Sequence, residues 1–113
     1  MNDTYPIYLK LADEVSAPEH YLPKAVITDD LCIITGQVRI NKEFRNGDII
    51  AYLPEQIWPK YNQFAPCFYQ NMSTFDKPKM IAFMTDGRVL IAHGGVYRKL
   101  SHFYFTGHAY SLV

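Results

Sequence analysis

The sequence has no long apolar run, no excess of charge of one sign and no signal-like start, and each absence excludes a class of protein. Eleven basic and eleven acidic side chains cancel, so the chain lacks the basic face that nucleic-acid binding requires. No apolar run approaches the roughly 20 residues of a membrane-spanning helix, and the polar start with Pro6 is unlike a signal peptide. These absences predict a soluble chain with neither a nucleic-acid partner nor membrane insertion.

The chain is also poor in the patterns that mark metal sites and activated nucleophiles. Its four histidines form no His-x-x-x-His pair, and there is no Cys-x-x-Cys pair and no Gly-x-Ser-x-Gly sequence. Cys32 and Cys67 each lie within an apolar run, which favours buried free thiols, with a disulfide as the alternative. We therefore expect no metal site and no cofactor.

What the chain does have is a high content of apolar and aromatic residues. The hydrophobic fraction is 49% and the aromatic fraction 15%, which excludes disorder and predicts one packed domain over residues 1–113. Nine tyrosines exceed the needs of a core this small, so some of these rings are expected at the surface, where tyrosine is a common contact residue.

Short alternating segments separated by turn residues predict an all-β fold. Strands are expected at residues 5–11, 24–28, 31–40, 48–53 and 63–70, in a hairpin over 79–93, and at 103–113. The turns fall at Asp29-Asp30, Asn46-Gly47 and Asp86-Gly87, and loops at 12–23, with a helical turn after Ala12, at 55–62 and at 71–78. The pattern is typical of a small antiparallel β-sandwich, jelly-roll-like, with about eight strands in two sheets.

Carboxylates that could cleave a glycan are present, but their positions suggest turns. Glycoside hydrolysis needs two acids about 5–10 Å apart across a cleft. Asp29, Asp30, Asp48 and Asp86 lie in or beside the predicted turns, where turn chemistry accounts for them, and the other acids considered were Asp76, Glu43 and Glu55. We therefore expect no enzymatic activity.

Glycan binding uses aromatic rings that stack on sugars, with polar groups nearby for the hydroxyls. The rings that fall in or beside predicted loops and the polar residues near them are Trp58, Tyr61, Tyr69, Tyr97 and Tyr104, with His93 and Arg98. Two alternatives stay open: Trp58 can plug one end of the sandwich, and Tyr104 can face solvent or a subunit interface. These seven residues are the candidate saccharide site.

The order of these segments resembles the C-terminal head domain of the receptor-binding proteins of phage tail fibres and baseplates, in phages of Gram-positive bacteria. The matching segments are residues 21–26, 34–38, 47–54, 58–60, 65–67, 81–91 and 105–110, which span most of the chain. Two positions depart from the family pattern. The proline turn has Lys60 after its proline and lacks the usual arginine before it, and His108 stands where an aliphatic residue is usual.

The resemblance implies a trimeric β-sandwich head at the tip of the virion tail, made in the host cytoplasm. It implies a host cell-surface glycan as receptor, other tail or baseplate proteins as partners, and attachment without cleavage. A structural virion module that trimerises the fibre end is the main alternative, and a polysaccharide-cleaving domain is the third. The sequence leaves open the host, the sugar, and a site within or between subunits.

Overall fold

The computed structural model describes residues 6–71, 74–75 and 77–113, and its regular elements are β-strands and short 3-10 turns. The strands are β1 Pro6–Tyr8, β2 Lys10–Leu11, β3 Val15–Ser16, β4 Lys24–Thr28, β5 Leu31–Ile40, β6 Phe44–Arg45, β7 Ile49–Tyr52, β8 Gln63–Asn71, β9 Thr74–Phe75, β10 Lys79–Phe83, β11 Arg88–Ile91, β12 Val96–Tyr97 and β13 His102–Ser111. The 3-10 turns are η1 Glu19–Tyr21 and η2 Glu55–Ile57. Within the described part of the chain, no helix has the length and apolar character needed to cross a membrane.

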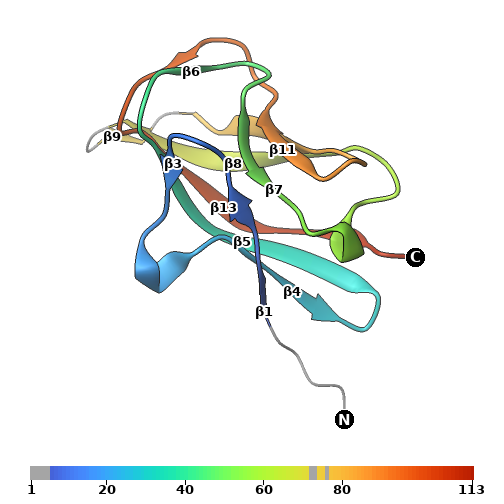
Figure 1. The fold of residues 1–113 in the computed structure, drawn as a ribbon. Coiled ribbons are helices and arrows are strands. Elements are labelled where there is room, and N and C mark those ends of the chain that lie inside the picture. Colours follow the sequence, from blue (N-terminus) through green and yellow to red (C-terminus); the bar gives the residue numbers. More distant parts are fainter. Residues whose placement is uncertain (1–5, 72–73, 76) are drawn as a thin grey trace.

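The main sheet is antiparallel and nearly closed on itself. Its strands follow the order β1-β4-β5-β13-β8-β10-β11-β7-β2, and a separate ribbon pairs β12 with β6 (Figure 1). β1 and β2 lie at the two ends of this order, yet they flank the single buried residue Leu9. The predicted edge strand at 5–11 therefore pairs with both ends of the sheet and brings them together; its first residue, Tyr5, lies outside the described residues.

The all-β, antiparallel prediction is confirmed, and the two expected sheets are joined. β8 pairs with β13 on one side and with β10 on the other, so the two layers are parts of one curved sheet. If the segment of β1 and β2 is taken as one strand, the main order contains the eight strands expected. The fold is therefore a strongly curved sheet that encloses its own core.

The long hairpin of β4 and β5 illustrates how the sequence specifies the sheet. Both strands have the predicted bounds, and burial alternates along β5, whose even-numbered residues face the core. Asp29 takes the left-handed conformation in the turn, at φ 53°. Gly36, at φ 126°, lies against the segment that precedes β4: a Cβ there would come within 2.4 Å of the Pro23 Cα, so only glycine fits.

Other local expectations need correction. The helical turn expected directly after Ala12 is found later, at η1, because Val15 and Ser16 instead pair with β5 as β3. In the loop expected at 71–78, β9 pairs with the end of β8, and residues 72, 73 and 76, including the acid Asp76, lie outside the described residues. Both cysteines are buried free thiols, which confirms the prediction for Cys32 and Cys67.

Candidate functional site

The seven residues predicted to bind a saccharide do not form one site. Trp58 and Tyr61 lie beyond η2, which Figure 1 shows at the far end of the molecule from β6. The Trp58 side chain is 40% exposed; its Nε1 donates to the Leu53 carbonyl at 2.9 Å, and its ring packs against Gly87. Trp58 is thus held against the β10–β11 turn with part of its ring in solvent, so both of its interpretations stay open, while Tyr61 is highly exposed.

The prediction that Tyr69 and Tyr97 are open to a sugar is wrong, because both rings belong to the core. The exposed fraction is 5% for Tyr69 and 2% for Tyr97. The two rings meet edge to face with centroids 5.2 Å apart, and each also packs against Phe103. Their hydroxyls find internal acceptors, since Tyr69 pairs with the buried Ser101 at 2.8 Å and Tyr97 donates to the His93 carbonyl at 2.8 Å.

The remaining three candidates lie near members of this aromatic cluster along the chain. His93 and Arg98 are exposed on either side of β12. Tyr104 points away from the core, because its neighbours in β13, Phe103 and Phe105, are the buried ones. Its hydroxyl donates to the Gln70 side chain on the adjacent strand. A role of these residues in binding stays a prediction.

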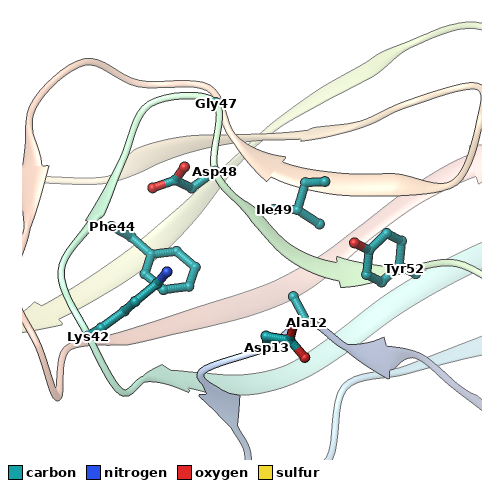
Figure 2. Close-up of a pocket in the computed structure, with 8 residues that line it drawn as sticks. All are labelled: Ala12, Asp13, Lys42, Phe44, Gly47, Asp48, Ile49 and Tyr52. Carbon is teal, nitrogen blue, oxygen red and sulfur yellow. The ribbon is translucent and has the colours of Figure 1, made fainter.

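The structure instead places a cavity of about 300 Å³ where the connection from β5 to β7 faces the turn after β2 (Figure 2). This volume lies at the lower end of the range for small-molecule sites. The residues that line it are Ala12, Asp13, Lys42, Phe44, Gly47, Asp48, Ile49 and Tyr52. Its lining thus combines two carboxylates, one ammonium group and the half-exposed ring of Tyr52.

Backbone hydrogen bonds hold both walls of this cavity. On one wall, Oδ2 of Asp48 accepts from the Arg45 amide at 2.8 Å, and the Asp48 amide donates back to the Arg45 carbonyl at 3.0 Å. On the other, the Ala12 amide donates to the Ile50 carbonyl at 3.2 Å and thereby ties the turn that carries Asp13 to β7. The cavity is therefore built into the sheet rather than into a free loop.

The charged groups of the cavity retain capacity to bind. Within the described residues, the Asp13 carboxylate and Oδ1 of Asp48 have no hydrogen-bond or ion-pair partner. The Lys42 ammonium lies 5.6 Å from the centroid of the Phe44 ring, a cation–π contact that leaves its protons available. A ligand here would meet both acceptors and donors of hydrogen bonds.

A second cavity, of about 250 Å³, has a different character. It lies between β5, β13 and the segment after β3, and its polar lining consists of Ser16, Gln37, Arg39 and His102. Nδ1 of His102 lies 2.7 Å from Nε2 of Gln37, which makes that ring nitrogen the acceptor. Burial, and then the charge of Arg39, hold the pKa of His102 below its usual range, so the imidazole is neutral at pH 7.

Sequence reasoning missed the residues of the first cavity. Asp48 was assigned to turn chemistry, and its bond to the Arg45 amide confirms that role while leaving one oxygen free. Asp13 and Lys42 are ordinary surface charges in the sequence, and no local pattern places them opposite each other. In the described part of the chain, no three histidine, cysteine or acidic side chains gather in a metal-binding group.

The fold of this chain is similar to that of a solved phage head domain. The solved structure that shows this is the head domain of phage bIL170, reported in the context of the receptor-binding domains of lactococcal phages. The two folds superpose with a TM-score of 0.73 over 98% of this chain and 100% of that domain, at 10% sequence identity. No protein-family profile and no curated protein matches the sequence. The resemblance drawn from the sequence is thus confirmed at the level of the fold.

Proposed function

We propose that this chain is the receptor-binding head of a phage tail fibre or baseplate, which attaches to a saccharide on the host cell surface without cleaving it. The observation that carries the proposal is the fold match along the whole chain to the head domain of a lactococcal phage. The protein would then act in the virion, at the tail tip, with other tail or baseplate proteins as neighbours. The neutral net charge also favours a glycan over nucleic acid as the bound surface.

We infer that the head works as a homotrimer, and an apolar surface on β8 supports this. The outward side chains of β8 include Phe64 and Phe68, with exposed fractions of 59% and 50%, and the exposed Pro66 between them. The two rings alone leave roughly 200 Å² of apolar surface in solvent. Met80 and Tyr104 lie on the neighbouring strands opposite Pro66 and Phe68 and extend this surface.

This β8 face has the composition of an interface core. Aromatic residues and methionine are enriched in protein interfaces, whereas charged residues are depleted from their centres. The face carries aromatic, proline and methionine side chains and no charge, and a contiguous apolar patch of several hundred Å² marks an interaction site on a soluble protein. Three copies that bury this face would present three receptor sites and gain avidity from weak contacts.

Binding without cleavage is supported by the turn roles of Asp48 and Asp86, two of the acids considered for cleavage. Asp48 accepts a backbone amide, and both carboxylate oxygens of Asp86 accept from the Arg88 side chain in the hairpin turn. Both therefore serve the turns that the sequence predicts, as turn chemistry requires. A cleaving enzyme would need two acids committed to a scissile bond.

The test of the function is adsorption of fluorescently labelled protein to a panel of Gram-positive cells, before and after chemical removal of wall glycans. We expect binding that is lost on stripping, with no oligosaccharide released from purified wall material. Binding that survives the removal of wall glycans would show that the receptor is a protein rather than a saccharide. Oligosaccharide release that disappears on Asp48→Asn substitution would make the protein a glycan-cleaving enzyme.

The β8 face also favours a second candidate function, a structural module that trimerises the fibre end without contacting the receptor. Both candidates require a trimer, and light scattering tests for it: the wild-type protein should have three times the 13.1 kDa mass of one chain, and Phe64→Glu with Phe68→Glu should have the mass of one. Tyr8→Glu, which also changes an exposed ring on a strand, is the control and should remain trimeric. A trimer that adsorbs to no strain of the panel would favour the structural module.

A further inference from the structure

We propose that the cavity lined by Asp13, Lys42, Asp48 and Tyr52 binds one neutral hexose unit of the host saccharide. None of the seven residues predicted from the sequence lines this cavity. The inference rests on the proposed function for its choice of a saccharide, but the cavity and its chemistry are independent of the fold match.

The hydrogen-bonding groups of the cavity select the ligand. Two carboxylates can only accept hydrogen bonds, and the ammonium can only donate them. A sugar hydroxyl does both, so the hydroxyls of one ring can donate to the free carboxylate oxygens and accept from Lys42. A hydrocarbon ligand would remove water from these three groups and would offer no hydrogen bonds in its place.

The charges exclude the other saccharide classes. Two carboxylates and one ammonium leave the lining with one net negative charge. A uronic acid or a sugar phosphate would bring its anion close to Asp13 and Asp48 and has no proton on that group to donate to them. A free amino sugar would suit the carboxylates but repel Lys42, so the neutral ring satisfies the whole lining.

The size and the aromatic wall fit one sugar unit. A cavity of about 300 Å³ is small among ligand sites and has room for a single ring with its substituents. Tyr52, exposed at 39%, offers an apolar surface next to the polar groups, the combination that recurs where a ligand has an apolar face and polar edges. Figure 2 shows Asp48 on the same side of this space as Phe44 and Lys42, Asp13 below it on a different segment, and Tyr52 on the opposite side.

The site is preorganised, which limits the entropy lost on binding. Asp48 is fixed through its own Oδ2, and the turn that carries Asp13 is held at both ends, by the Ala12 amide and by the Asn41 amide, which donates to the Glu14 carbonyl at 2.7 Å. Groups held in place before binding lose less conformational freedom when the ligand arrives.

The first test is a titration of ¹⁵N-labelled full-length protein with D-glucose, N-acetyl-D-glucosamine and D-glucuronate, up to tens of millimolar. We expect at least one neutral sugar to shift the amide signals of residues 13, 42, 48 and 52, and glucuronate to leave them unchanged. No shift with any sugar, shifts confined to the second cavity at Arg39 and His102, or equal shifts with glucuronate would each overturn the proposal.

Asp13→Asn is the diagnostic variant, because this carboxylate has no partner within the described residues and its loss should leave the fold intact. Asp48→Asn is less suitable, since Oδ2 of Asp48 holds the turn. Loss of a charged hydrogen-bond acceptor should weaken sugar binding about tenfold. Asp30→Asn, an exposed acid in the β4–β5 turn, makes the same charge change away from the cavity and should bind as wild type.

Cell adsorption of the same variants separates this inference from the proposed function. If wild-type protein adsorbs in a glycan-dependent way and Asp13→Asn adsorbs as well as Asp30→Asn, the cavity is not the receptor site and the proposed function stands. If the sugar titration shifts the cavity residues but no cell binds the protein, the cavity assignment stands and the proposed function fails.

Discussion

Replacing Tyr97 by alanine is expected to destabilise the domain strongly rather than to remove a sugar contact. The ring is 2% exposed and packs against Tyr69 and Phe103 at centroid distances of 5.2 and 5.4 Å. Truncation of a buried aromatic residue destabilises a protein by about 3–5 kcal/mol, and the two aromatic contacts place Tyr97 toward the upper end of that range. A domain of this kind has about 5–15 kcal/mol of total stability.

The assay is urea unfolding followed by the fluorescence of Trp58, the single tryptophan. With a slope of about 1–3 kcal/mol per molar urea, the Tyr97→Ala variant should lose at least about 1 M in its midpoint, or be unfolded without urea. Tyr97→Phe keeps the ring and loses only the hydrogen bond to the His93 carbonyl, so it should lose about 1 kcal/mol.

Tyr61→Ala is the matched control, because this ring is 77% exposed and its removal should change stability by no more than about 0.5 kcal/mol. The reasoning is refuted if Tyr97→Ala unfolds at the wild-type urea concentration. If that stable variant also failed to adsorb to cells, Tyr97 would be a receptor contact after all.

Three further predictions concern the core and its edges. His108 stacks on Phe83, and burial holds its pKa below its usual range, so as the pH falls the unfolded chain takes up a proton at about pH 6.5 before the folded one does. The stability of the folded protein should therefore fall as pH drops from about 7 toward 5. The fall should be smaller in His108→Leu, while His93→Gln should behave as wild type. Burial raises the pKa of Cys67 to about 12 and also raises that of Cys32. Neither thiol should therefore react with a disulfide reagent at about pH 8 until urea unfolds the chain. Rapid reaction in the folded state would contradict this. Gly87 has φ 88°, and a Cβ there would lie 2.1 Å from the Trp58 Nε1. In Gly87→Ala we therefore expect a shifted Trp58 emission and a loss of stability greater than the about 1–2 kcal/mol that the left-handed conformation costs. Gly47 has φ 93° with open space around it, so Gly47→Ala should lose only that smaller amount.

The sequence predicted the strands well where the signals are local. Alternation of apolar residues and turn residues such as Asp29-Asp30 depend on a few neighbouring positions, and β4, β5 and the Asp86-Gly87 hairpin appear where expected. Two-residue strands such as β3 and β6 have too few residues for a period to show. They exist because a partner strand lies beside them, which is a tertiary property.

The burial of individual tyrosines shows the limit most clearly. Tyr97 stands among polar residues in the sequence and was expected at the surface, yet pairing of β12 with β6 turns its ring into the core against Tyr69 and Phe103. Conversely, Phe64 and Phe68 are of a residue type that is usually buried, but they lie on the outward face of β8. The period of a strand tells which residues share a face, and only the curvature of the sheet decides which face is inside.

The sequence by itself determined the fold class and favoured the buried free thiols, because composition, alternation and turn chemistry are properties of short stretches of chain. The candidate binding cavity was decided by tertiary structure alone. Asp13, Lys42 and Tyr52 come from three separate segments, and they meet because β1 and β2 bring together the two ends of the sheet and place the turn after β2 against β7. That closure depends on long-range backbone pairing, which no local pattern of side chains encodes.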